Sequence, residues 1–244
     1  MRYRLTIEYD GTPFVGWQRQ QAPDSVQQVL EEALAVALRH PVVLFGSGRT
    51  DAGVHAWGQV AHFDTDAVLD GERLRESVNA LVRPHPIVIR SAEPVPDTFH
   101  ARTSARQRTY VYVIQNTPHP PALDRDRVWH VRAPLDAAQM QRAGDMLIGK
   151  HDFSTFRAAA FQAKSPVKTL DELRVEREGD RILITARARS FMHHQVRNIV
   201  GSLVSVGSGR WTIADFEDAF RACDRKRGGE TAPARGLYFI GVRY

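Results

Sequence analysis

Polar and apolar residues alternate at the start of the chain, and a different spacing follows. The segment Arg2–Tyr9 reads polar, apolar, polar, apolar, which is typical of a strand with one buried face. In Val26–Leu38 apolar residues recur at every fourth position, as on one face of a helix. Ser25 and Gln28 form a capping box at the start of this segment, and Pro41 lies just beyond its end. The two patterns predict a strand followed by an amphipathic helix.

The same two spacings continue through the rest of the chain and predict the remaining elements. In the first half they predict strands at Val42–Phe45, Gln59–Phe63 and Ile87–Ala92 and a helix at Glu72–Leu81. In the second half they predict strands at Arg108–Gln115, Lys168–Arg177, Arg181–Arg189 and Leu237–Arg243, and helices at Ala137–Leu147, His193–Val206 and Ile213–Ala222. Apart from the helix at Ile213–Ala222, each half follows the ferredoxin-like order β-α-β-β-α-β, without a convincing sequence repeat.

This element order predicts an α+β protein. We expect two ferredoxin-like halves, residues 1–105 and residues 106–244, with mainly antiparallel sheets packed side by side around a central cleft. No low-complexity linker separates the halves, and ligand sites favour the seam between two such halves.

Composition excludes several classes of protein. Hydrophobic residues make up 43% and charged residues 25% of the 244 residues, which argues against a disordered or fibrous chain. No apolar run approaches the roughly 20 residues that span a bilayer, and the strand pattern at Arg2–Tyr9 leaves no room for a signal peptide. The single cysteine, Cys223, allows no intramolecular disulfide and no multi-thiolate zinc site. We therefore expect a cytoplasmic protein that is not a membrane protein.

The charge of the chain favours a polyanionic partner. The formal net charge is +5 and the isoelectric point is near 9.6, and the basic residues are overwhelmingly arginine. The planar guanidinium suits bidentate phosphate contacts, so a nucleic acid is one candidate partner. A basic surface that only aids solubility is the other interpretation, and charge alone does not separate the two.

Glycines are concentrated between two predicted strands, at positions 46, 48, 53 and 58. This spacing predicts a loop whose backbone approaches another group closely. A dinucleotide-binding motif would need glycine where Asp51 stands and a helix afterwards, whereas strand-like residues follow. No Walker A sequence is present either, so we expect no nucleotide cofactor.

Arg49 and Asp51 stand two residues apart in this loop. In an extended segment their side chains point to the same side, where the guanidinium would orient the carboxylate and keep it ionised. Such a carboxylate acts as a nucleophile or stabilises a developing positive charge. A surface ion pair or an Asx turn explains the same two residues without any chemistry.

Several long motifs, in a fixed order along almost the whole chain, resemble the TruA class of tRNA pseudouridine synthases. The segment around Asp51 is similar to the active-site motif of that family. Two small departures, Ser47 and Gln195, affect only local packing. The motifs that carry the resemblance are Glu8–Thr12, Gly16–Gln20, Gly48–His55 with Gly58–Val60, Phe99–Arg102, Arg108–Tyr110, Asp152–Phe156, His193–Gly201 and Gly236–Tyr238.

The resemblance implies the roles of four residues. Asp51 would be the catalytic nucleophile, with Arg49 and Arg197 as its charge partners, and Tyr110 would contact the substrate base. From the sequence pattern alone, Tyr110 fits the core face of a strand equally well, and helix-surface arginines such as Arg197 are usually just solvated. The pattern of the last long helix places His193 and Arg197 one turn apart.

The resemblance also implies the reaction and the partners. It implies isomerisation of uridine to pseudouridine at tRNA positions 38, 39 and 40 in the anticodon stem-loop, by a homodimer whose two subunits both contact tRNA. We expect no cofactor. We expect no metal either, since His193 and His194 are adjacent rather than four residues apart. Arg102, Arg106 and Arg108 become candidates for phosphate contacts. The remaining alternative is a noncatalytic RNA-binding protein of the same fold.

Overall fold

The computed structural model describes residues 1–21, 24–68, 70–158 and 165–244. These residues form two compact units, which are Met1–Arg106 with Tyr238–Tyr244 (unit 1) and Gln107–Leu237 (unit 2). The sequence-based division at residues 105 and 106 assigns the last strand to the second half, whereas this strand clusters with unit 1. Its position follows from backbone pairing, because Tyr238 and Phe239 pair with His55 and Ala56.

Unit 1 contains a mixed sheet in which most neighbouring strands are antiparallel. The strand order is β4-β1-β3-β10, and β2 pairs with β3. Among the strand pairs of the described residues in this unit, that of β10 with β3 is parallel and the others are antiparallel. The strands are β1 (Arg2–Tyr9), β2 (Phe45–Gly46), β3 (His55–Asp64), β4 (Ile87–Val95) and β10 (Leu237–Arg243).

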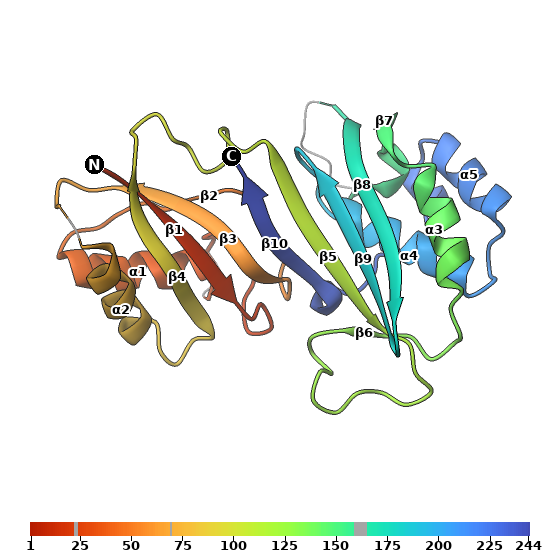
Figure 1. Ribbon diagram of the computed structural model, residues 1–244, viewed down its shortest axis with the longest axis horizontal. Coiled ribbons are helices and arrows are strands. Elements are labelled where there is room, and N and C mark those ends of the chain that lie inside the picture. The colour runs from red at the N-terminus through yellow and green to blue at the C-terminus, as the bar shows by residue number, and fades with distance from the viewer. Residues whose placement is uncertain (22–23, 69, 159–164) are drawn as a thin grey trace. The chain divides into compact units, whose positions relative to one another are not determined.

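Two helices bury the apolar residues of this sheet. They are α1 (Val26–Leu38) and α2 (Gly71–Leu81), which contact each other, and α2 also lies along β4 (Figure 1). Alternate residues of β1 are buried, namely Tyr3, Leu5, Ile7 and Tyr9. The Ser25 hydroxyl caps α1 by accepting a hydrogen bond from the Gln28 backbone, as the capping box predicts.

Unit 2 is built around an antiparallel sheet with the strand order β5-β9-β8-β7, and the short β6 runs parallel to β5. Helix α3 contacts β8, α4 and α5 (Figure 1). The strands are β5 (Gln107–Gln115), β6 (Trp129–His130), β7 (Gly149–Asp152), β8 (Val167–Glu178) and β9 (Arg181–Ala188); the helices are α3 (Ala137–Asp145), α4 (Gln195–Gly207) and α5 (Ile213–Arg221); and the 3₁₀ turns are η1 (Ser154–Phe156), η2 (Arg225–Arg227) and η3 (Ala234–Gly236).

The prediction of an α+β protein with mainly antiparallel strands is confirmed. The predicted strand at Val42–Phe45 is wrong, since only Phe45 and Gly46 pair with β3. Polar side chains of α1 take the place of a neighbouring strand at Leu44: its N–H donates to the Glu31 carboxylate, and its carbonyl accepts from Gln27. The four residues form an apolar run, as in a buried strand, but the Leu44 backbone bonds to side chains of α1 rather than to a neighbouring strand.

Candidate active site

Asp51 lies in the loop that joins β2 to β3, and β3 holds the start of this loop through one backbone carbonyl and one side chain. The Ser47 backbone N–H donates to the Val60 carbonyl at 2.7 Å. The buried Gln59 accepts from the Ser47 hydroxyl at 2.7 Å and donates to the Gly48 carbonyl at 2.8 Å. Three hydrogen bonds therefore fix the chain directly before Arg49.

The segment that precedes α1 holds the other side of the loop through backbone contacts. The Trp17 N–H donates to the Thr50 carbonyl at 3.1 Å, and the Gly53 N–H donates to the Phe14 carbonyl at 3.4 Å. Gly16 has φ of +110°, and a Cβ at this position would lie 2.7 Å from the Thr50 carbonyl oxygen. Only glycine permits both this conformation and this close approach.

Asp51 itself begins a tight turn. Its carbonyl accepts from the Val54 N–H at 3.1 Å, and its side chain is half-buried. Arg49 is exposed, and its Nε donates to Oε1 of Gln18 at 3.1 Å. Arg49 thus contacts the segment preceding α1. The turn holds the Asp51 backbone in a fixed conformation.

A buried tyrosine supports the loop from β1. Tyr9 shares a hydrogen bond of 2.7 Å with the Thr50 hydroxyl. Burial raises the pKa of Tyr9 to about 12, although its hydrogen bonds to Thr50 and Gln59 act in the opposite direction. Tyr9 therefore stays a neutral phenol at physiological pH and serves as a structural contact one residue from Asp51.

His55, at the far end of the loop, brings three of the family-like motifs together. Its Nδ1 accepts from the Gly11 backbone N–H at 3.0 Å and lies 3.1 Å from Oδ1 of Asp10. Its ring stacks on Tyr238 with a centroid separation of 4.8 Å. A Cβ on Gly11 would lie 2.0 Å from the Val54 carbonyl oxygen, so this approach also requires glycine.

Tyr110 belongs to unit 2 and lies in the middle of β5, where it pairs with Ala186 of β9. Its side chain is only 8% exposed. The ring of Phe191 meets the Tyr110 ring edge to face, with a centroid separation of 5.2 Å. Both the core interpretation and a substrate contact by the exposed edge are compatible with this burial.

Arg197 also belongs to unit 2 and lies in the first turn of α4. Its Nε donates to the Ala232 carbonyl at 2.7 Å, and its own carbonyl accepts from the Ala232 N–H at 3.1 Å. The side chain is half-buried. The first bond restrains the guanidinium and the second holds the backbone of this turn, whereas the guanidinium of an ordinary helix-surface arginine would move freely in solvent.

The start of α4 differs from the sequence-based prediction. The helix begins at Gln195, and His194 before it has φ of +61°. His193 therefore lies outside the helix, and the expected relation of one turn between His193 and Arg197 is wrong. The rings of His193 and His194 lie 3.9 Å apart.

Sequence reasoning did not single out Asn198, the buried centre of a polar network in unit 2. Its Nδ2 donates to the Phe156 carbonyl at 2.9 Å and to the Arg157 carbonyl at 3.2 Å. Its Oδ1 accepts from the Thr231 hydroxyl at 2.6 Å and from Arg225 at 3.2 Å. An amide within an apolar helical stripe is the signal that would have revealed it, since buried amides need partners.

Comparisons with known proteins agree with the motifs that surround these residues. The family model described as tRNA pseudouridine synthase matches residues 5–104 and 143–244. A protein named tRNA pseudouridine synthase A from Rhodospirillum rubrum is 53% identical over 244 residues, which cover all of this chain and 88% of the relative. A protein of the same name from Xanthobacter autotrophicus is 54% identical over 243 residues, covering 100% of this chain and 99% of the relative.

Among solved structures, a chain of a Cbf5-Nop10-Gar1 complex is 10% identical, with a TM-score of 0.41 over 83% of this chain and 45% of that chain. This likeness is too distant to carry a conclusion.

The class defined by these motifs is that of enzymes that rearrange uridine in RNA. The chain belongs to the tRNA pseudouridine synthase family. Among the residues that the structure describes, no helix is long and apolar enough to cross a membrane.

Proposed function

We propose that this protein isomerises uridine to pseudouridine in tRNA, with Asp51 as the nucleophile. The reaction breaks the C1′–N1 glycosidic bond, rotates the uracil and joins C1′ to C5. The proton lost from C5 is balanced by one gained at N1, so no redox equivalent and no phosphate donor is consumed. Family membership and the fixed loop around Asp51 together support the proposal.

A carboxylate suits this chemistry in two ways. It attacks an electrophilic carbon and splits a difficult exchange into two steps, or it stabilises an oxocarbenium-like sugar, as in glycosidases. Attack at C1′ of the ribose and attack at C6 of the uracil both satisfy the atom balance. The half-burial of Asp51 favours reaction with a base that has left its helical stack.

We assign supporting roles to three further residues. Tyr110 would stack on the extruded uracil, and its phenol is suited to move the C5 proton. Arg197, which its contacts to Ala232 hold in place, would carry positive charge for the carboxylate or for a phosphate. Arg49 lies two residues from Asp51 and would bind the RNA backbone or the carboxylate once substrate is bound.

The proposal extends to the substrate and the assembly. The family resemblance supports uridines 38, 39 and 40 of the anticodon stem-loop as targets and a homodimer. The order of elements along the sequence supports two ferredoxin-like halves around a central cleft, and the sequence pattern with its single cysteine supports a cytoplasmic location. Light scattering after size-exclusion chromatography measures the oligomeric state directly.

The experiment that tests the function compares wild type with Asp51→Asn on unmodified tRNA, without any cofactor. Pseudouridine is mapped by primer extension after carbodiimide treatment. We expect stops in the anticodon stem-loop with wild type. With Asp51→Asn we expect at least about a thousandfold lower rate, because the neutral amide is no nucleophile.

Binding and a matched variant complete the design. The affinity of Asp51→Asn for tRNA should stay within about twofold of wild type, since affinity comes mainly from cationic contacts to phosphates and the substitution removes none of these. Asp66→Asn, at an exposed position of unit 1, should keep full activity. Wild-type protein that binds tRNA and forms no pseudouridine would instead identify a noncatalytic RNA-binding protein.

A further inference from the structure

A hydrogen-bond network of polar side chains connects the buried face of helix α1 with Arg49 in the Asp51 loop. Glu31 and Gln27 lie on the buried face of α1, at 7% and 6% exposure, among apolar side chains. Buried polar groups need partners, because water is no longer there to bind them. The two side chains bond to each other, and their other partners among the described residues lie in the segment before α1 and at Leu44, directly before β2.

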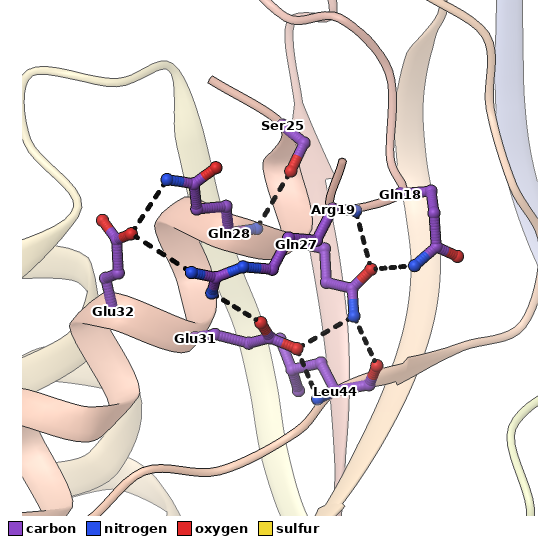
Figure 2. A network of polar contacts seen from close by, with 8 residues as sticks. All are labelled: Gln18, Arg19, Ser25, Gln27, Gln28, Glu31, Glu32 and Leu44. Carbon is purple, nitrogen blue, oxygen red and sulfur yellow. Dashed lines mark hydrogen bonds and ion pairs between the residues drawn. The ribbon is translucent and has the colours of Figure 1, made fainter. Parts of the chain in front are cut away.

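Glu31 is the innermost residue of this hydrogen-bond network (Figure 2). Its carboxylate accepts from the Leu44 N–H at 3.0 Å and from Gln27 at 2.9 Å. It also accepts from the guanidinium of Arg19 at 3.1 Å. Leu44 directly precedes β2, so Glu31 holds the strand that leads into the loop as well as the segment before α1.

Gln27 connects Glu31 with Gln18, as Figure 2 shows. Its Nε2 donates to Glu31 and, at 3.0 Å, to the Leu44 carbonyl. Its Oε1 accepts from Nε2 of Gln18 at 2.8 Å and from the Arg19 N–H at 2.9 Å. Because both groups of the amide are used, Gln27 has one orientation and fixes the Gln18 amide in turn.

Gln18 is the exposed residue of this hydrogen-bond network that contacts the Asp51 loop. Once its Nε2 is committed to Gln27, its Oε1 faces outward, and this oxygen accepts from Nε of Arg49 at 3.1 Å. The backbone follows the same path. The Val26 and Gln27 N–H groups at the start of α1 donate to the carbonyls of Gly16 and Trp17, and Trp17 donates to Thr50.

We propose that Gln18 is a positioning residue of the active site: oriented by Gln27 and Glu31, it presets the guanidinium of Arg49, two residues before Asp51 in the same loop. This inference rests on the proposed function. Preorganisation matters here because an exposed arginine has many rotamers, and ordering one of them beforehand lowers the cost of reaching the reactive arrangement. Gln18 is itself exposed, so its role is separable from the stability of the fold.

The test uses the full-length protein and three glutamine variants. Gln18→Leu removes both amide contacts. Gln18→Glu keeps an oxygen acceptor for Arg49 and loses the donor to Gln27. Gln20→Leu is the matched control, because Gln20 is exposed and lies two residues further along the same segment. Its bond among the described residues is to the Val15 carbonyl, at 3.3 Å, and not to Arg49 or α1.

Single-turnover kinetics on unmodified tRNA provide the first measurement. We expect Gln18→Leu to lower the rate constant about tenfold, with tRNA affinity and melting temperature close to those of wild type. Gln18→Glu should recover the rate to within about threefold of wild type, and Gln20→Leu should match wild type. Equal rates for Gln18→Leu and Gln20→Leu would overturn the proposal, as would a loss confined to tRNA affinity.

A second measurement does not depend on activity. In protein labelled with ¹⁵N at arginine Nε, the Arg49 resonance is assigned by its disappearance in Arg49→Lys. We expect this resonance to shift in Gln18→Leu and to stay in place in Gln20→Leu. An unchanged resonance in Gln18→Leu would contradict the inference even in an active enzyme. A shifted resonance in a protein that makes no pseudouridine would contradict only the proposed function.

Discussion

The loop around Asp51 and the helix turn around Arg197 are held in place by different means. The Asp51 loop depends on backbone hydrogen bonds and on glycines that allow close approach, chiefly Gly11 and Gly16. The turn around Arg197 depends on a buried side chain, Asn198, whose amide forms hydrogen bonds with four other residues. Each region therefore has its own sensitivity to substitution.

The difference follows from the secondary structure that each region uses. A loop has many backbone groups without ladder partners, and neighbouring backbone satisfies them only if it comes close. A helix satisfies most of its own backbone, so further attachment must come from side chains. We thus expect the geometry at Asp51 to depend on the absence of Cβ atoms. We expect the attachment of the helix turn that carries Arg197 to depend on the Asn198 amide, while the Arg197 side chain has its own bond to Ala232.

The largest expected effect is that of Gly16→Ala. The added Cβ meets the Thr50 carbonyl oxygen at 2.7 Å, and φ is +110°, so we expect a loss of more than about 3 kcal/mol of unfolding free energy. The single-turnover rate should fall at least about tenfold at temperatures where the protein is still folded, because Thr50 adjoins Asp51. Urea unfolding and tRNA turnover measure the two effects.

Gly209→Ala is the control for this substitution. Gly209 also has positive φ, +75°, but a Cβ there has no neighbour within 4 Å. Its cost should be only roughly 1–2 kcal/mol, the penalty of the left-handed conformation, with an unchanged rate. Equal losses for the two variants would mean that close approach at Thr50 does not matter.

Asn198→Ala tests the other region. The variant leaves two carbonyls, the Thr231 hydroxyl and Arg225 without the amide, so we expect about 3 kcal/mol of lost stability. The rate should fall less than about tenfold, because the contacts of Arg197 to Ala232 are still present. Thermal unfolding and single-turnover kinetics check both expectations.

Thr231→Val tests the contribution of a single hydrogen bond in the Asn198 network. It removes one hydroxyl that bonds to Asn198 at 2.6 Å and should cost about 1 kcal/mol. A larger loss in Thr231→Val than in Asn198→Ala would place the centre of the network elsewhere.

The two regions also differ in how far the sequence alone predicts them. The bounds of β1, α1 and β10 agree with the predictions, because alternation and a capping box are local signals. The glycine spacing likewise predicted a loop of close approach. The partners in that approach, such as Gly16 with Thr50, are 34 positions apart and leave no local signal.

The missed contacts share one physical cause. The predicted strand at Val42–Phe45 failed because Glu31 and Gln27 satisfy the Leu44 backbone, and the Arg49 guanidinium contacts Gln18 because the fold brings that amide near. The buried role of Asn198 likewise depends on residues near positions 157 and 231. Each is a side-chain contact between segments distant in sequence, which spacing along the chain does not encode.

Smaller than the effects of Gly16→Ala and Asn198→Ala is an expected acid sensitivity of β3, the strand that leads out of the Asp51 loop. Burial, together with the positive charges of Arg2 and His100, lowers the pKa of His62 from 6.5 to about 4, although Asp64 acts in the opposite direction. Between these two pH values the His62 imidazole therefore binds a proton in the unfolded chain but not in the folded protein. Stability is complete above pH 6.5 and declines as the pH falls towards 4, by about 2 kcal/mol between pH 6.5 and pH 5.

In urea unfolding at these two pH values, His62→Asn should lose this part of the pH dependence, and the exposed His119→Asn should retain it. The same pH dependence in wild type and His62→Asn would show that the proton binds elsewhere, and the acid sensitivity would then no longer distinguish the Asp51 region.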